Sequence, residues 1–329
     1  MKALLGIFLT LGLIFASLPA AAAQDNEAPT LPGFGDAVAW TDESGNTIAS
    51  ATVNDVQNDF RDYGQGYGPE YGYAYTLVDI SVVNSSDSAI ILEAHTFVLV
   101  DDQGRGYNRL NFSGAGVETF NDDLPLAPGE SAELTLGYSI PAHLNATMFA
   151  WSPGTEQIHY VVLTTVVNEN SAIAWGVETP SVFTDEFGNV VASFQITDIN
   201  EDWTDYSDFY EPEDGGRYMT VNIAITNETD RPVDIERYDF TMMFADGRDT
   251  SAASVKVKDG VEQEPFRERI ALQPGESTEV MIAFELTSEQ VPAGVVWSPD
   301  YSITNIVFFA SPPAAPTETD PTEATPEAN

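Results

Sequence analysis

The sequence predicts an all-β chain that folds as two tandem immunoglobulin-like antiparallel β-sandwiches. The first observation is an internal repeat, because segments 41–107 and 184–250 align without a gap and 24 of 67 positions are identical. The second is an alternation of apolar and polar residues, which is typical of strands with one buried face. The third is the regular spacing of turn sequences between these strands, which favours a sandwich.

Residues 1–23 have the pattern of an export signal. Lys2 is followed by an uncharged apolar run, and Ala21-Ala22-Ala23 supplies the small residues that precede a cleavage site. The apolar run is shorter than the roughly 20 residues that cross a membrane. We therefore expect a secreted or extracellular mature chain without a membrane span. An uncleaved N-terminal anchor is the alternative.

The rest of the chain divides at changes in composition. Residues 24–35 are polar and contain Pro and Gly, which is typical of a flexible lead. The first sandwich is expected over 36–167 and the second over 172–310, with a polar junction at 168–171. Residues 311–329 contain Pro, Thr, Ala and acidic residues but no large apolar side chain, so we expect a disordered tail there.

Alternating apolar residues mark two long strands in each repeat. The residues expected to face inward are Val78, Ile80, Val82, Leu134, Leu136, Tyr138 and Ile140 in the first repeat, and Val221, Ile223, Ile225, Val280, Ile282, Phe284 and Leu286 in the second. The residues between them, including Thr135, Met281 and Ala283, are expected on the solvent side. Antiparallel sheets commonly have one solvated face, whereas parallel sheets are covered on both, so the pattern favours antiparallel sheets.

Turn sequences separate the expected strands. Asn84 and Asn227 open the turns that follow the central strands. Pro128-Gly129 and its counterpart Pro274-Gly275 suit type II turns, because Pro fixes φ and Gly accepts a positive φ. The sequence Trp-Ser-Pro at 151–153 recurs later in the second repeat. It indicates core packing, and a surface contact with carbohydrate is the alternative.

The composition excludes several classes of function. The chain has no cysteine, which removes disulfides, thiolate metal sites and cysteine nucleophiles. It has 12 Lys and Arg residues against 52 Asp and Glu residues, a formal net charge of −40. Such a polyanion is repelled by phosphate groups, so we expect no nucleic-acid partner. The acidity suits a soluble or salt-adapted surface, and it also suits a Ca²⁺ site.

A longer pattern points to a family. The stretch 75–107 combines an alternating strand, an Asn-Ser turn, a strand that begins at Phe97 and an Asp-Gln-Gly turn, and Leu-Ala-Pro-Gly-Glu-Ser follows at 126–131. This pattern resembles the bacterial secreted immunoglobulin-like domains of unknown function that include the mycobacterial immunoprotective extracellular antigen. The resemblance covers most of both repeats, although Thr250 replaces Tyr107 in the second. It implies the fold in two copies and brings no established activity.

An acidic, aromatic loop precedes the central strand of each repeat, at 58–72 and 201–215. Its carboxylates can converge on a Ca²⁺ ion, which takes about six to eight oxygen ligands. The candidate metal ligands are Asp59, Asp62 and Glu70 in the first loop and Asp202, Asp205, Asp208 and Glu213 in the second. The candidate ligand-binding residues are Tyr63, Tyr67, Tyr206 and Tyr210, because their rings can stack on a sugar or a peptide. The alternative is a solvated loop that its aromatic residues staple down.

Other candidate sites are weaker. The histidines His95, His143 and His159 share no metal-ligand spacing, so we interpret them as incidental. Neither a nucleophile elbow nor a phosphate-binding Gly loop occurs in the sequence.

We therefore expect an exported, non-catalytic interaction module that contacts an extracellular or envelope ligand through its loops or a sheet face. We expect no cofactor other than a candidate Ca²⁺ ion. One alternative is a Ca²⁺-binding adhesion or stability module that uses both acidic loops. Another is a glycosidase-like enzyme with paired carboxylates, although the abundance of acids makes any single pair uninformative.

Overall fold

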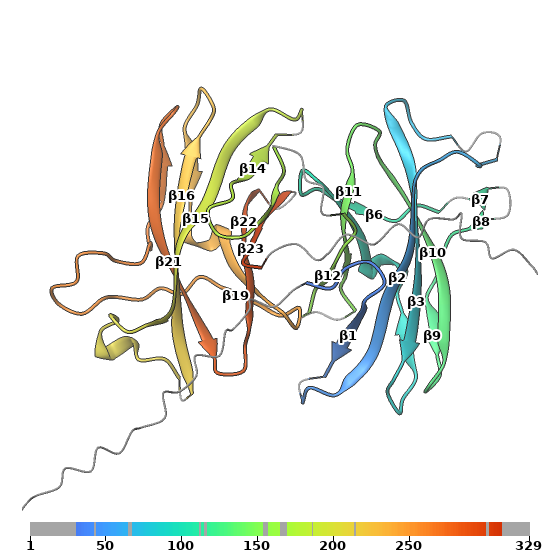
Figure 1. Cartoon of the computed structure of the whole chain (residues 1–329), viewed down its shortest axis with the longest axis horizontal. Helices are drawn as coiled ribbons and strands as arrows, with labels where there is room; N and C mark the ends of the chain where they lie inside the picture. The colour runs from blue at the N-terminus through green and yellow to red at the C-terminus, as the bar shows by residue number, and fades with distance from the viewer. Residues whose placement is uncertain are drawn as a thin grey trace, which may run out of the picture.

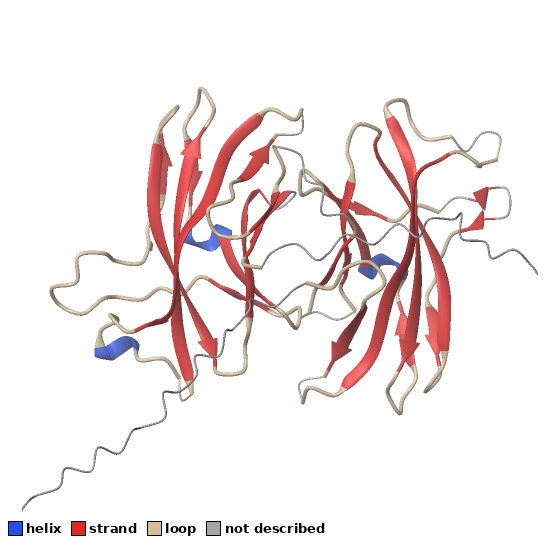
Figure 2. Cartoon of the chain, in the orientation of Figure 1, coloured by secondary structure: helices blue, strands red, loops and turns tan. Residues whose placement is uncertain are grey.

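The computed structural model describes residues 31–310, with gaps at 43, 65–67, 112, 115–116, 154–156, 165–169, 186, 214 and 301–302. The predicted export signal, most of the predicted lead and the predicted tail lie outside the described residues. Two β-sandwiches lie side by side, the N-terminal one blue to green and the C-terminal one yellow to red in Figure 1. Nearly all regular structure is strand, and the helical turns described are 3₁₀ segments at Ala94–Thr96, Asp208–Tyr210 and Arg237–Asp239 (Figure 2). The all-β prediction is confirmed.

The first sandwich places two four-stranded sheets face to face. One has the order β1-β2-β3-β10, formed by Ala37–Thr41, Thr47–Phe60, Tyr73–Asn84 and Ser131–Pro141. The other has the order β12-β11-β5-β6, formed by His159–Val162, Ala146–Trp151, Phe97–Asp101 and Gly106–Asn108. Two short pairs complete it, β4 with β9 (Ile90–Leu92, Leu124–Leu126) and β7 with β8 (Ser113–Gly114, Val117–Glu118). Neighbouring strands in these sheets are antiparallel, as predicted.

The second sandwich repeats this plan. One sheet has the order β14-β15-β16-β21, formed by Ser181–Thr184, Val190–Trp203, Gly216–Asn227 and Ser277–Thr287. The other has the order β13-β23-β22-β18-β19, formed by Ile173–Trp175, Ile303–Phe308, Pro292–Asp300, Phe240–Phe244 and Asp249–Ser251. The pair β17 with β20 (Val233–Ile235, Ile270–Leu272) matches β4 with β9. One difference from the prediction is that β13 pairs with β23 in parallel.

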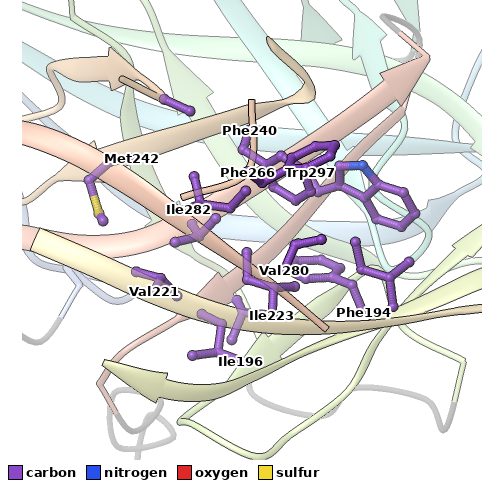
Figure 3. Close-up of a cluster of buried hydrophobic side chains, with 14 of the residues drawn as sticks. Phe194, Ile196, Val221, Ile223, Phe240, Met242, Phe266, Val280, Ile282 and Trp297 are labelled. Carbon is purple, nitrogen blue, oxygen red and sulfur yellow. The ribbon is translucent and has the colours of Figure 1, made fainter. Parts of the chain in front are cut away.

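Each sandwich has its own apolar core, and the expected inward-facing residues line it. In the first, Val78, Ile80 and Leu136 have no exposed surface. Figure 3 shows the second core, where Trp297 lies beside Phe240 and Phe194. Trp297 stacks on Phe240 with an interplanar angle of 10°.

The first core repeats this arrangement, because Trp151 stacks on Phe97 at the same interplanar angle of 10°. Both tryptophans are at most 2% exposed. Core packing is therefore the correct interpretation of the repeated Trp-Ser-Pro sequence.

The outer face of one sheet departs from the prediction. Met281 and Ala283 were expected to face solvent, yet they are 7% and 1% exposed. The segment 252–269 crosses this face, and its Val255 packs with Met281 and Ala283 against Trp203. The strand alternation is correct, but a long loop covers the end of the sheet that the alternation assigns to water.

The two sandwiches also share an apolar contact. It combines Leu31, Val100, Met148, Ala150 and Val162 with Ile173, Met243, Ile306 and Phe308, all at most 7% exposed. Backbone hydrogen bonds cross the same contact, from Ile158 N–H to the Gly247 carbonyl (2.8 Å) and from Ala172 N–H to the Asp102 carbonyl (2.9 Å). The sheets of β11–β12 and β22–β23 therefore face each other between the two cores (Figure 1). In the described part of the chain, no helix has the length and apolarity that a membrane crossing needs.

Candidate functional site

The first acidic segment spans the end of β2 and the loop to β3, and the strand residue Asp59 has an unusual backbone conformation. Asp59 has a φ of 54°, a left-handed conformation that is uncommon outside glycine. Its carboxylate forms an ion pair with Arg61, which holds the pKa of Asp59 below its usual value. Both side chains are largely exposed, so the pair fixes the loop more than it stabilises the fold.

Aromatic packing holds the base of this loop against the sheet. Tyr63 is half-buried and meets Tyr75 edge to face, with ring centroids 5.5 Å apart. Phe60 and Leu77 belong to the same cluster. Tyr67, also predicted as a ligand-binding residue, lies outside the described residues. Tyr63 therefore packs at the base of the loop, and a role for it in ligand binding stays a prediction.

The second acidic loop joins β15 to β16 and is stapled in the same way. Tyr206 lies 6.0 Å from Trp203 and 5.2 Å from Tyr218, measured between ring centroids. Tyr210 packs at the edge of this cluster. The duplicated sequence therefore folds into a duplicated aromatic base.

A lysine secures the second loop from outside. Lys258 lies on the segment 252–269 and donates from Nζ to the Thr204 carbonyl at 2.6 Å, while its backbone N–H donates to the Asp205 carbonyl at 2.8 Å. The ammonium group also lies 5.7 Å from the ring centroid of Tyr206, close enough for a weak cation–π contact. A fixed positive charge therefore already sits beside the acidic loop.

The structure separates the predicted metal ligands among several local contacts. Asp62, Glu70 and Asp208 are exposed, or nearly so, on the loop surfaces. The backbone N–H of Asp202 donates to Asn200 Oδ1 at 3.2 Å, and that of Glu213 donates to Glu285 Oε1 at 3.1 Å. Among the described residues, no three His, Asp or Glu side chains gather closely enough to hold a metal ion. The Ca²⁺ site stays a prediction, which calorimetric titration of Ca²⁺ into chelator-treated protein tests.

Among the described residues, the two most exposed aromatic rings, Tyr71 and Phe209, are ones that the sequence did not single out. Tyr71 in the first loop is fully exposed, and Tyr73 beside it is 42% exposed. Phe209 in the second loop is 89% exposed and meets Tyr210 edge to face at 5.4 Å. Tyr210 thus supports an exposed ring, whereas Tyr63 and Tyr206 are turned into the loop bases. Side-chain exposure is what distinguishes the exposed rings from the packed ones. The sequence does not distinguish them, because all these residues are aromatic and lie in similarly polar segments.

A hollow lies next to the first loop. It encloses 310 Å³ and is lined by side chains from β2, including Asp55 and Asn58, and by Asn145 and Ala146 at the start of β11. The turn before β11 also holds the end of the loop, because Ala142 N–H donates to the Gly72 carbonyl at 2.9 Å. The turn before β11 therefore contacts both the hollow and the end of the loop.

Two joined sandwiches, each with a stapled loop that carries an exposed ring, define the chain as a duplicated β-sandwich protein. The chain belongs to the family described as a domain of unknown function (DUF4352), whose model matches it twice, at residues 42–154 and 185–305. The match confirms the predicted resemblance to a family of domains of unknown function in two tandem copies. No curated protein matches the chain.

Three solved structures are similar to parts of the chain. The yjhA protein from Bacillus subtilis is 16% identical over 41% of this chain and 100% of its own, with a TM-score of 0.31. A "putative lipoprotein (ycdA)" from Bacillus subtilis is 18% identical over 41% of this chain and 39% of its own, with a TM-score of 0.31. A conserved hypothetical protein from Bacillus anthracis is 16% identical over 38% of this chain and 90% of its own, with a TM-score of 0.23.

Proposed function

We propose that the chain is an exported, non-catalytic interaction module that contacts an extracellular or envelope ligand through the aromatic tips of its two acidic loops. The observation that carries the proposal is the exposure of Tyr71 and Phe209 on loops whose bases are packed. Exposed aromatic side chains on ordered loops supply contact area to a ligand with little loss of conformational entropy.

The packed bases support this function. Tyr63 and Tyr206 hold each loop on its sheet, and Lys258 adds a second attachment in the C-terminal sandwich. A loop that is already ordered loses less entropy when a ligand binds. The two loops project at opposite ends of the molecule, at the upper right and the lower left of Figures 1 and 2. One chain can therefore contact two ligand molecules at once, which raises avidity on a repetitive surface.

The test is a binding screen with a matched exposed aromatic as control. Fluorescently labelled protein is applied to an array of glycans and peptides, and the double variant Tyr71→Ala/Phe209→Ala is compared with Phe187→Ala. Phe187 is 80% exposed but lies on a short hairpin between β14 and β15. We expect the double variant to lose at least tenfold in affinity for any retained ligand, and Phe187→Ala to bind as the wild type does.

Two results would contradict the proposal. One is a retained ligand whose affinity does not change in the double variant, and the other is an array on which the wild type retains nothing. The proposal that the chain is non-catalytic is tested separately. We expect the retained ligand to be recovered chemically unchanged after long incubation with the protein. Cleavage of that ligand would favour the enzyme alternative.

A further inference from the structure

A second surface feature lies on the first sandwich, away from the loops. In both sandwiches a segment leaves the second sheet and runs along the free edge of the last long strand, β10 or β21. Two backbone hydrogen bonds attach it in each copy. They are Leu110 N–H to the Gly137 carbonyl (2.6 Å) and Phe120 N–H to the Thr135 carbonyl (2.7 Å), then Ala253 N–H to the Ala283 carbonyl (2.7 Å) and Phe266 N–H to the Met281 carbonyl (2.6 Å). Phe120 and Phe266 are therefore equivalent positions, and the residues that follow can be compared one by one.

In the first sandwich this segment leaves a groove of 690 Å³ between itself and β10. The apolar part of its lining comes from Phe120, Leu124 and Leu134, which are half-buried against the core. Carboxylates surround it, from Glu118, Asp122, Asp123 and Glu133, and each of these side chains is exposed. Among the described residues that line the groove, none is Lys, Arg or His.

The second sandwich has two arginines on the equivalent segment, and both are paired with carboxylates. Arg267 forms an ion pair with Glu264, and Arg269 forms one with Asp234. Arg269 also lies 3.8 Å from Glu236. The guanidinium of Arg269 holds the pKa of Asp234 below its usual value.

The first sandwich lacks both arginines and keeps two of their three acidic partners. Glu118 and Glu93 stand where Glu264 and Glu236 do, and Ile91 replaces Asp234. Asn121 replaces Arg267, and Asp123 replaces Arg269. The surface that carries two arginines in the second copy therefore carries an asparagine and an aspartate in the first, where Arg109 donates from Nη1 to Asn121 Oδ1 at 2.8 Å.

We propose that this groove binds an extended, arginine-bearing segment of a partner protein, whose guanidinium groups take the places that Arg267 and Arg269 hold in the second copy. Guanidinium groups suit carboxylates because they donate two parallel hydrogen bonds. The apolar lining takes the aliphatic side chains between the arginines. Single exposed ion pairs contribute little, so affinity requires several carboxylates and the apolar contact together.

Charge identifies the occupant as a different protein. The chain's own tail at 311–329 contains acidic residues but no Lys or Arg, so the groove repels it. A second copy carries the same net charge of −40 and is repelled as well. A cationic partner is instead attracted at long range by the whole chain and held at the groove.

The test uses a fluorescein-labelled peptide of alternating Arg and Val residues, titrated with the full chain and followed by fluorescence anisotropy. A peptide with citrulline in place of Arg keeps the shape without the charge. The key variant is Asn121→Arg/Asp123→Arg, which copies the second sandwich into the first. We expect it to weaken binding of the Arg peptide at least tenfold, and we expect the citrulline peptide to bind at least tenfold more weakly than the Arg peptide.

Two further variants separate the groove from general attraction to a polyanion. Asp87→Asn/Asp230→Asn/Glu289→Gln changes the net charge by the same +3 at exposed turns, and it should bind as the wild type does. Arg267→Asn/Arg269→Asp gives the second copy the two residues that the first copy has at these positions, so we expect the stoichiometry to rise from one peptide to two. Circular dichroism confirms that each variant folds.

The proposal is overturned if the grafted arginines leave the affinity unchanged, if the citrulline peptide binds equally well, or if the charge-matched variant loses as much affinity as the graft. This test is independent of the proposed role of the aromatic loop tips. Tyr71→Ala/Phe209→Ala removes those tips but leaves the groove intact, so we expect it to bind the Arg peptide with wild-type affinity.

Discussion

Asn84 holds a turn closed from inside the first sandwich. Its side chain has no exposed surface, and Nδ2 donates to the carbonyls of Ser88 (2.8 Å) and Leu126 (3.0 Å). Its Oδ1 accepts from the backbone N–H of Ser86 at 3.0 Å. Asn227 makes equivalent bonds in the second sandwich. An asparagine that a sequence marks only as a turn residue is therefore a buried link between two segments.

Replacing this side chain tests the link. Asn84→Ala removes the donor of two carbonyls, and we expect it to lower the free energy of unfolding by about 2–3 kcal/mol. Urea unfolding followed by tryptophan fluorescence measures the loss. Asn111→Ala is the control, because Asn111 is exposed and surface changes usually stay within about 0.5 kcal/mol. Equal losses in both variants would contradict the role of Asn84.

His159 is a buried titratable residue at the contact between the sandwiches. It is 4% exposed, its ring centroid lies 5.9 Å from that of Trp151, and the Gly247 backbone approaches its other side. Burial lowers the pKa of His159 to about 4, although the nearby carboxylate of Asp246 opposes the shift. The second copy has Asn305 at the equivalent position.

The depressed pKa of His159 makes stability depend on pH. Between about pH 6.5 and about pH 4 the unfolded chain binds a proton that the folded chain excludes, so stability falls as the pH falls through this range. We expect His159→Asn to remove a loss on the order of 2–3 kcal/mol. Melting temperatures of both proteins across this range measure it, and the difference between them cancels the titration of the shared carboxylates. Parallel curves would show that His159 contributes nothing.

At the scale of elements, the strands and their turns were predictable and the long connections were not. The alternation at Val78–Val82 specifies which side of β3 is buried, and the Gly residues after Pro128 and Pro274 do adopt positive φ, 74° and 71°. The segment 252–269 has no such period, so nothing in the sequence showed that it would bury Met281. The acidic loops also lack a regular apolar period. Their positions could therefore be predicted, but the sequence did not show which of their aromatic rings are exposed and which pack against the sheet.

The attachment of the second loop gives a test at this scale. Lys258→Ala removes the bond from Nζ to the Thr204 carbonyl and the contact with the Tyr206 ring. We expect faster hydrogen–deuterium exchange at 204–213 and a loss of about 1 kcal/mol of stability. Lys256→Ala is the control. Its side chain is exposed, and both variants lose one positive charge, so their net charges are equal. Unchanged exchange in Lys258→Ala, or equal changes in both variants, would contradict the attachment.

At the scale of the whole molecule, the strands at the contact between the sandwiches have a distinct sequence pattern. The residues of β11, Ala146–Trp151, are all buried, and so are most of β22 and β23 where side chains are described. These strands have continuous apolar runs rather than alternating ones, which is typical of strands covered on both faces. The runs indicate a second buried face, but they do not say what covers it. The structure shows that each copy covers the other.

This contact predicts that the two sandwiches behave as one body. Met148 has no exposed surface and lies in the shared apolar cluster. A carboxylate at this position cannot stay buried without a partner, so we expect Met148→Asp to separate the sandwiches while each core remains folded. Small-angle scattering should then show a larger radius of gyration, and calorimetry should show two unfolding transitions in place of one. Ile91→Asp is the control, because Ile91 is 63% exposed and should leave both measurements unchanged. A Met148→Asp protein that keeps the wild-type radius and a single transition would mean that the apolar contact does not hold the two copies together.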